Sequence, residues 1–206
     1  MQFLKQYKGQ FPSGVCKQLI DIAEDPEGYS YAAGVMRGNT SLVDKRAMDS
    51  TTLELGSKYT KKLTKELCQE LEHHLFPALT HYINECSPQI QIGDRIAEMS
   101  IEDVKRKYFL TQPPRLNRYK IPNQAYHGWH TDWGPCTKER EISCILYLND
   151  VEVGGETEFY HQGVKIKPEE GKIIISPSGF THIHRSVPPI SNDKYICIFW
   201  VGRDPN

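Results

Sequence analysis

The chain has 206 residues, with 25 Lys and Arg against 26 Asp and Glu, a formal net charge of -1 and 38% hydrophobic residues. This composition is that of an ordinary globular protein and argues against a disordered chain, and the length fits a single domain spanning residues 1–206. Proteins that hold nucleic acid through its phosphates usually carry a basic excess, so we expect no nucleic-acid partner.

The sequence also lacks the signals of export and membrane insertion. Residues 1–8 do not form the apolar core of a signal peptide, and no apolar run reaches the about 18 residues of a membrane span. The six cysteines include no CxxC pair, which favours reduced thiols over a zinc site or a disulfide framework. We therefore expect a cytoplasmic protein without a membrane partner, and none of these features predicts an oligomeric state.

Helical periodicity dominates the first part of the chain, to about residue 105. A short helix is predicted from Ser13 to Glu24, where apolar residues recur near helical spacing. A longer helix is predicted from about Thr51 to Asn84, because leucines recur there at three- to four-residue steps, with a break or kink at Pro77. Residues 28–49 have no period and suggest a surface loop or a weak strand.

From about residue 106 the pattern changes to short β-rich segments separated by turn residues. The predicted strands are Leu116–Tyr119, Tyr126–Asp132, Ile142–Leu148, Glu156–Tyr160, Lys165–Lys167, Lys172–Ser176, His182–Val187 and Tyr195–Val201. Their number and spacing are typical of a sandwich or jelly roll. Because no linker or repeat separates the two parts, we predict one α+β domain, with N-terminal helices (about 1–105) packed on the sheet of a jelly-roll core (about 106–206).

The segment His130-Thr131-Asp132 has the clearest chemical meaning. In a strand, side chains two residues apart lie on the same face, which brings the imidazole and the carboxylate together. One histidine from a distant strand would complete a 2-His-1-carboxylate set, which binds Fe(II) and leaves positions for oxygen and a chelating cosubstrate. His-x-Asp alone is a weak signal. His182 and His184 are both candidates for the third ligand, and their equal strand parity does not separate them.

Longer stretches around these residues resemble the prolyl 4-hydroxylase family of Fe(II)/2-oxoglutarate-dependent oxygenases. The matching segments are Tyr126–Asp132, Cys144–Asn149, Gly154–Phe159 and His184–Lys194, in this order. In that family a proline lies four residues after the second histidine and a basic residue about ten after it. His184 has Pro188 and Lys194 at these places, whereas His182 has other residue types there. The resemblance therefore implies His184 as the third ligand and a double-stranded β-helix, a cupin-like jelly roll, as the fold.

The same resemblance implies an anchor for the cosubstrate. Lys194 stands where the family places the cation that binds the far carboxylate of 2-oxoglutarate, and a lysine there acts as a point charge beside hydroxyl donors. Lys194 precedes the apolar residues 195–200, and a buried lysine needs an anion. Trp200 has the parity of Lys194, so we expect it to face the same pocket.

Hydroxyl donors for the cosubstrate are implied by the resemblance as well. Tyr147 is similar to the tyrosine on the adjacent strand of related hydroxylases, and Thr157 of the Gly-Gly-Glu-Thr turn can also donate. Tyr126 resembles the family tyrosine upstream of the first histidine. It lies four residues before His130, where the family pattern has three, so Tyr119 stays open as an alternative.

Taken together, the resemblance implies an enzyme that uses Fe(II), 2-oxoglutarate and O2, with ascorbate as reductant, to hydroxylate a C–H bond with release of succinate and CO2. The expected partner is a proline-containing peptide or protein. Residues expected to border its groove are Tyr29, Tyr31, Trp129, Trp133 and Arg140. The alternatives are the same chemistry on another amino acid or small molecule, and an inactive metal-binding jelly-roll module.

Overall fold

Strands from both parts of the chain form the central sheet of the fold. The computed structural model describes residues 3–25, 31–32, 35–37, 40–55, 64–86, 91–92, 95–96 and 98–204. The strands are β1 (Lys5–Tyr7), β2 (Tyr31–Ala32), β3 (Val35–Arg37), β4 (Thr40–Leu42), β5 (Met48–Asp49), β6 (Thr51–Glu54), β7 (Gln91–Ile92), β8 (Arg95–Ile96), β9 (Tyr108–Leu110), β10 (Arg115–Tyr119), β11 (Ala125–Tyr126), β12 (Ile142–Tyr147), β13 (Thr157–Phe159), β14 (Val164–Ile166), β15 (Ile173–Pro177), β16 (His184–Ser186) and β17 (Lys194–Arg203). The central sheet has the order β1-β15-β12-β17-β10-β6-β2, with β9 also paired to β17.

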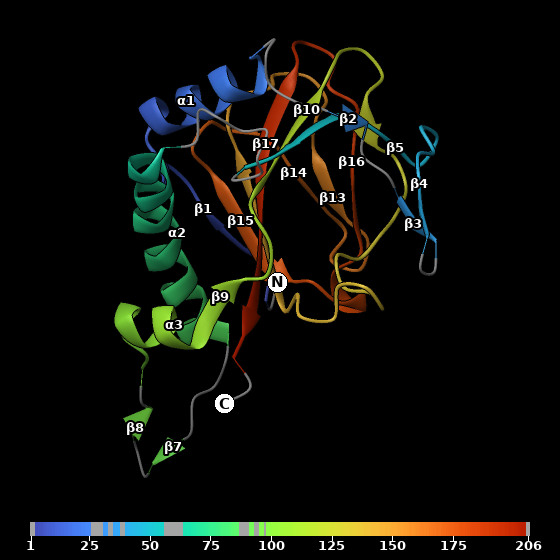
Figure 1. Cartoon of the computed structure of the whole chain (residues 1–206). Coiled ribbons are helices and arrows are strands. Elements are labelled where there is room, and N and C mark those ends of the chain that lie inside the picture. Colours follow the sequence, from blue (N-terminus) through green and yellow to red (C-terminus); the bar gives the residue numbers. More distant parts are fainter. Residues whose placement is uncertain are drawn as a thin grey trace.

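Three helices cover one face of this sheet (Figure 1): α1 (Ser13–Ala23), α2 (Lys65–Cys86) and α3 (Ile101–Lys107). The sequence predicts α1 almost to the residue. At α3, Ser100 caps the first turn, since its side chain accepts from the Asp103 backbone N–H while Asp103 accepts from the Ser100 backbone N–H. The sequence does not predict α3, because this helix has only seven residues and little periodic signal.

The long helix predicted from Thr51 is wrong at its start. Thr51–Glu54 is strand β6, which pairs antiparallel with β10, and the helix α2 begins at Lys65. Residues 56–63 of that prediction lie outside the described residues. The β-branched Thr51 and Thr52 favour a strand, and Leu53 is buried opposite Leu116 of β10. Pro77 lies inside α2, which does not end there.

Side chains of the central sheet alternate between two cores. One set, which includes Cys144 and Leu146 of β12, packs against the helices. The other set, which includes Ile145 and Tyr147, packs against a smaller sheet of order β14-β13-β16. Two facing sheets with helices outside them are the predicted α+β jelly roll, and this fold class is confirmed. Lys194 belongs to the inward-facing set, between the two sheets.

Two predicted strands are shorter than expected. The strand predicted from Tyr126 to Asp132 is regular only as β11, after which His130 forms an isolated bridge with His184. The strand predicted from His182 begins at His184, because residues 180–182 form a short 3-10 helix, η1 (Phe180–His182). The predicted loop or weak strand at residues 28–49 contains the short strands β2 to β5.

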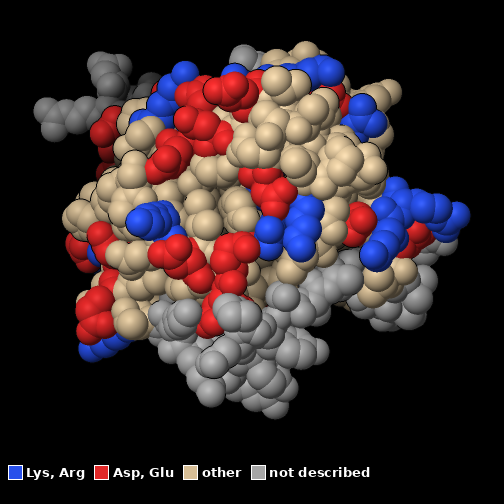
Figure 2. All heavy atoms as spheres, turned by 90° about the horizontal axis from the view of Figure 1, so that it is seen from above, with Lys and Arg blue, Asp and Glu red and all other residues tan. Residues whose placement is uncertain are grey.

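Surface charge and cysteines add two further observations. Asp and Glu side chains are spread over the end of the molecule seen in Figure 2, with Lys and Arg side chains among them. No disulfide joins the six cysteines, all of which lie in the described residues, and Cys16, Cys144 and Cys197 are buried. Within the described ranges, no helix is long and apolar enough to cross a membrane.

Candidate functional site

His130, Asp132 and His184 come together at the open side of the space between the two sheets. One ligand atom from each of the three lies within 4.8 Å of the others, and His184 Nε2 is 3.8 Å from Asp132 Oδ2. The backbones of His130 and His184 exchange two hydrogen bonds of 3.0 Å. This bridge fixes the two imidazoles side by side, although the regular strand assumed from parity ends before His130.

Both imidazoles present the same ring nitrogen to the site. His130 Nδ1 is 3.0 Å from the Gly128 carbonyl, and His184 Nδ1 is 3.0 Å from the His182 carbonyl. A carbonyl oxygen only accepts, so each Nδ1 donates its proton and each Nε2 keeps a free lone pair. Such orientation by a backbone carbonyl is what metal-binding histidines need.

Burial keeps His130 neutral. It lowers the pKa of that imidazole to about 3, with the nearby His184 acting in the same direction and Asp132 opposing it. The ring of Tyr126 stacks on His130, with centroids 3.5 Å apart and planes 8° apart. A neutral, fixed imidazole at neutral pH is ready to donate its lone pair to a cation.

Asp132 supplies the negative charge. Burial alone would raise the pKa of its carboxyl, but the two imidazoles and the Ser143 hydroxyl outweigh that effect, so the pKa is lowered. Its backbone carbonyl accepts from Thr137 Oγ1 at 2.9 Å and from Arg140 at 3.2 Å. Two imidazoles and one carboxylate fit the donor set that binds Fe(II) and leaves coordination positions open.

A cavity of about 710 Å³ adjoins the three residues and has Lys194 in its wall. Lys194 is 0% exposed, and its Nζ donates to Ser186 Oγ at 2.9 Å. Burial lowers its pKa to about 7, against the opposing charge of Glu156. Among the residues that the structure describes, Lys194 has no carboxylate within ion-pair distance, so the cavity offers a buried cation to an anionic ligand.

The tyrosines predicted beside the cosubstrate occupy different places. Tyr119 and Tyr126 both line the cavity. The hydroxyl of Tyr119 accepts from Asn117 Nδ2 at 3.2 Å, which leaves its own proton for a ligand. Tyr147 is fully buried behind the wall, and its hydroxyl lies 2.6 Å from Thr157 Oγ1. Thr157 lines the cavity, and by accepting from Tyr147 it keeps its own proton available.

Trp200 lines the same cavity, as its parity with Lys194 predicts. Its ring has the Arg140 guanidinium 4.0 Å from the centroid and that of Arg115 at 5.1 Å. The indole Nε1 is buried and has no hydrogen-bond partner among the described residues. A buried donor without a partner is costly, which is a further sign that the cavity accommodates a polar ligand.

Sequence reasoning missed several wall residues, among them Ser186, Asn117 and Arg115. Parity carried a signal for each. Ser186 lies two residues after His184 in β16, and Asn117 and Arg115 share the parity of Tyr119 in β10.

His182 lies outside the cluster of His130, Asp132 and His184. It ends η1, its Nδ1 lies 2.9 Å from Thr181 Oγ1, and its ring packs edge to face with Phe159. Burial lowers its pKa to about 4. His182 thus lies in the 3-10 turn and His184 in the strand, which distinguishes the two ligand candidates that strand parity left equal.

Three of the expected groove residues lie at or beside the cavity. Trp133 and Arg140 line it, and Trp129 packs on Arg185, another wall residue, whose guanidinium is 4.5 Å from the indole ring. Trp129 and Trp133 are 41% and 48% exposed. Tyr29 lies outside the described residues, and only the backbone of Tyr31 is described.

Comparison with known proteins agrees with this geometry. Residues 114–202 match the model of the 2OG-Fe(II) oxygenase superfamily. Prolyl 4-hydroxylase 13 of Arabidopsis thaliana is 29% identical over 106 residues, which are 41% of this chain and 38% of that protein. A PKHD-type hydroxylase of Xylella fastidiosa (strain M12) is 35% identical over 107 residues, 44% of each chain. The chain thus spans less than half the length of these curated relatives.

A solved structure supports the fold over the whole chain. It is a prolyl hydroxylase from Trichoplax adhaerens in complex with a hypoxia inducible factor peptide fragment, with a TM-score of 0.70 at 15% identity, covering 98% of this chain and 84% of that one. Fe(II) and 2-oxoglutarate, with O2, are the cofactors that the superfamily match and the His-Asp-His cluster fit. The predicted resemblance is confirmed: residues 114–202 are similar to the 2OG-Fe(II) oxygenases, and prolyl hydroxylases are among the proteins that this part of the chain resembles.

Proposed function

We propose that the protein is an Fe(II)- and 2-oxoglutarate-dependent dioxygenase that hydroxylates a prolyl residue of a peptide or protein. The observation that carries this proposal is that Lys194 is buried in the same cavity as the His130, Asp132 and His184 cluster and has no ion-pair partner among the described residues. A metal ion at the three-residue cluster and the Lys194 ammonium elsewhere in the cavity would match the two ends of a dianionic keto acid.

Each residue of the site has a role in this proposal. When bound, Fe(II) and 2-oxoglutarate supply the activation of O2 and the oxidation of a C–H bond, with release of succinate and CO2. His130, Asp132 and His184 hold the metal. Lys194 binds the far carboxylate, with hydroxyl protons from Thr157 and Tyr119 or Tyr126 directed at the cosubstrate.

Tyr147 and Trp200 complete the cosubstrate set in this proposal. Tyr147 acts through Thr157, because its hydroxyl bonds to Thr157 Oγ1 and its ring lies 5.5 Å from the Lys194 ammonium. Trp200 closes the wall beyond Ile196 and Ile198 and offers its unpartnered N–H. The same residues exclude water from the buried end of the cavity. We further propose that residues 1–206 act as one domain, because α1 and α2 pack on the sheet that carries Lys194.

The exposed aromatic side chains near the cavity support a prolyl substrate. Trp133 lines the cavity and Trp129 stands beside it on Arg185, so flat apolar surfaces flank the metal-binding cluster. Proline-rich segments are extended and preordered, and they bind aromatic surfaces at a low entropic cost. One relative in the solved structures is itself a prolyl hydroxylase with a bound peptide.

A small amino acid or carboxylic acid is the second candidate substrate, favoured by Arg140. This guanidinium lines the cavity, is bonded to Gln112 and to the Asp132 carbonyl, and has no ion-pair partner in the described part of the chain. A carboxylate on a small substrate would satisfy it.

The experiment that tests the function measures succinate released from 2-oxoglutarate with Fe(II) and ascorbate, in the presence of proline-containing peptides or of free amino acids. We expect peptide-dependent succinate release and a mass increase of about 16 on proline, the mass of one oxygen. The matched control is His184→Ala. Turnover with free amino acids alone would select the second candidate. No turnover with any substrate, together with no Fe(II) binding, would contradict the enzymatic function.

A further inference from the structure

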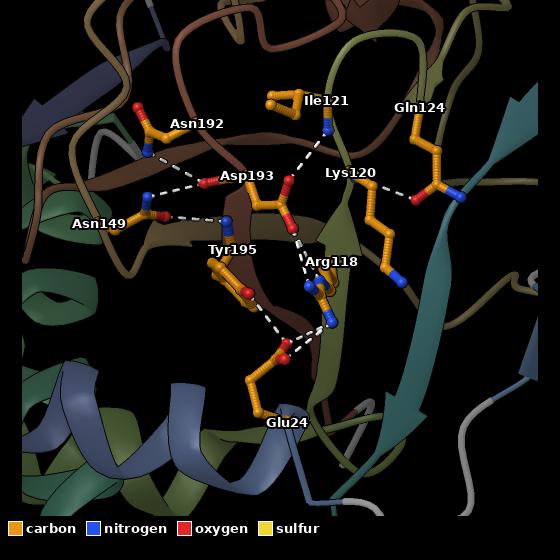
Figure 3. Close-up of polar contacts among 9 residues, drawn as sticks. All are labelled: Glu24, Arg118, Lys120, Ile121, Gln124, Asn149, Asn192, Asp193 and Tyr195. Carbon is orange, nitrogen blue, oxygen red and sulfur yellow. Dashed lines mark hydrogen bonds and ion pairs between the residues drawn. The ribbon is translucent and has the colours of Figure 1, made fainter.

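A side chain continues the central sheet at the point where Lys194 begins β17. β12 pairs with β17 as far as Tyr147 and Ile196, and Leu148 N then donates to Tyr195 O at 3.0 Å. Beyond this point, the Asn149 carboxamide takes the place of a paired strand. Its Oδ1 accepts from Tyr195 N and its Nδ2 donates to Asp193 O, each at 2.9 Å (Figure 3). One carboxamide thus bonds the backbone on both sides of Lys194.

The opposite edge of this segment is held by β10. Tyr119 pairs with Lys194 in the antiparallel register. The Asp193 carboxylate accepts from Arg118 at 2.9 and 3.0 Å and from the backbone N–H of Ile121 at 3.0 Å (Figure 3). Residue 194 therefore has bonded backbone neighbours toward both adjacent strands, although it is the first residue of its own strand.

Lys194 needs this fixation more than an ordinary strand residue does. Its long side chain is fully buried, with the ammonium bonded to Ser186 and 5.4 and 5.5 Å from the ring centroids of Tyr119 and Tyr147. Strand ends fray unless their backbone groups are bonded, and a small shift of the backbone moves the end of a lysine by more. The ammonium can stay at the closed end of the cavity only while its backbone keeps this register.

We propose that Asn149 is a positioning residue for Lys194, the cation that binds the cosubstrate. The Asn149 carboxamide holds the backbone of residues 193–195 so that the Lys194 ammonium faces the far carboxylate of 2-oxoglutarate. The proposal rests on the role proposed above for Lys194. It assigns Asn149 no contact with the cosubstrate.

Asn192 provides a matched control in the same loop. Its Nδ2 donates to Asp150 O at 2.9 Å and to Asp193 O at 3.1 Å, and Asn149 Nδ2 donates to the same two acceptors, at 3.0 and 2.9 Å. It makes no bond to Tyr195 N, which Asn149 accepts. Removing either amide loosens the loop, but only the loss of Asn149 removes the bonds on both sides of Lys194.

The first measurement is the dissociation constant of 2-oxoglutarate, determined by calorimetry on protein loaded with Mn(II), which does not turn over. Asn149→Ala loses the two hydrogen bonds that flank Lys194, together with the one to Asp150 O, and is expected to raise this dissociation constant about tenfold. Mn(II) affinity should stay unchanged, and Asn192→Ala should bind 2-oxoglutarate within about twofold of the wild type. Asn149→Asp keeps an acceptor for Tyr195 N but loses the donor to Asp193 O, so an intermediate value is expected.

A second measurement needs no cosubstrate. Buried Lys194 should react slowly with formaldehyde and borohydride in the wild type and in Asn192→Ala, and faster in Asn149→Ala, as measured by peptide mass spectrometry. If Asn149→Ala does not fold, Asn149→Asp carries both comparisons.

The two measurements separate the possible failures. A wild-type protein that binds Mn(II) but no 2-oxoglutarate contradicts the proposed function, and the lysine labelling then decides on positioning by itself. A folded Asn149 variant with wild-type labelling of Lys194 and wild-type 2-oxoglutarate affinity overturns the positioning role.

Discussion

The chemistry of the site depends on how a few side chains are prepared before any ligand arrives. His130 and His184 each donate the Nδ1 proton to a backbone carbonyl, so the lone pairs of their Nε2 atoms are available to a metal. Lys194 is fully buried, with its ammonium bonded to Ser186 and without a carboxylate partner in the described residues. The unsatisfied charge is a cost to the folded protein that an anionic ligand would relieve.

Replacing each of the two neighbouring histidines tests the ligand assignment. We expect His184→Ala to lose metal-dependent succinate release, because one of three donors is removed. His182→Ala should retain most of it, since His182 is bonded to Thr181 and is outside the cluster. Binding of Mn(II) to both variants, measured by calorimetry, checks the assignment. The reverse order of the two variants would show that His182 is the ligand.

Removing the Lys194 ammonium should chiefly weaken the cosubstrate. For Lys194→Ala we expect a loss of about 2–3 kcal/mol in 2-oxoglutarate binding, the value of a buried charge-assisted hydrogen bond, with metal affinity kept. Calorimetry with 2-oxoglutarate on Mn(II)-loaded protein measures this. An unchanged affinity would mean that another residue holds the far carboxylate.

The pKa of Lys194 predicts a pH dependence for the same step. Because burial lowers this pKa to about 7, the ammonium is present below pH 7, and above it binding of the dianion must take up a proton. The dissociation constant of 2-oxoglutarate should therefore rise from pH 7 to 9, by at most about tenfold per pH unit. Lys194→Arg, which stays charged, should flatten this profile. A flat wild-type profile would contradict the assignment.

In the ligand-free protein, the free energy of unfolding should increase with pH over a range in which 2-oxoglutarate binding weakens. The pKa of Lys194 falls from 10.5 to about 7 on folding, so between these values the unfolded chain binds more protons. This residue's contribution to the free energy of unfolding should thus rise with pH across that window, and Lys194→Met should remove it. Urea unfolding at a series of pH values compares the two proteins. Equal pH slopes would rule out a depressed pKa.

At the scale of elements, turns and caps hold the strands that carry the site. Gly154 has φ of 76° and lies shortly before β13, the strand that carries Thr157. It forms a β-bridge with Pro189, in the segment that follows β16 and His184. A Cβ at Gly154 would overlap the carbonyl oxygen of Pro188 and lie 3.1 Å from Ile190 Cγ1. The sequence suggested only a turn there, and the structure adds the reason for glycine.

Gly154→Ala and Gly163→Ala separate crowding from backbone strain. Gly163 also has a positive φ, 63°, but nothing lies within 4 Å of its Cβ position. Gly163→Ala should cost about 1–2 kcal/mol for the left-handed conformation alone. Gly154→Ala should cost at least about 1 kcal/mol more, because the backbone must also move. Urea unfolding measures both, and equal losses would contradict the crowding at Gly154.

At the scale of the whole molecule, periodicity predicted the elements of the second half of the chain better than those of the first half. Alternating apolar residues located β12 and β17 within a few residues, and the pattern at Ser13 located α1. The leucine pattern from Thr51 misled, because Leu53 and Leu55 were grouped with the helical leucines that follow, although they are two residues apart, as in a strand. Both are buried by a sheet that β10 completes from about 60 residues away in sequence. Local pattern does not contain that pairing.

The residues of the candidate site also divide into those that the sequence predicted and those that it did not. His130, Asp132, His184 and Lys194 were singled out from motif spacing, and all four lie at one cavity. Parity also placed Trp200 there. The roles of Asn149 and Ser186 could not be predicted, because they depend on hydrogen bonds between segments that only the folded backbone brings together.

The central claim is that one metal, held by His130, Asp132 and His184, and Lys194 together bind 2-oxoglutarate. The most direct test is anaerobic calorimetry of 2-oxoglutarate into wild-type protein with and without Fe(II). We predict binding at one site that requires Fe(II), is absent in His184→Ala and is weakened in Lys194→Ala. Equal binding of 2-oxoglutarate with and without Fe(II), or no binding at all to the Fe(II)-loaded protein, would contradict the claim.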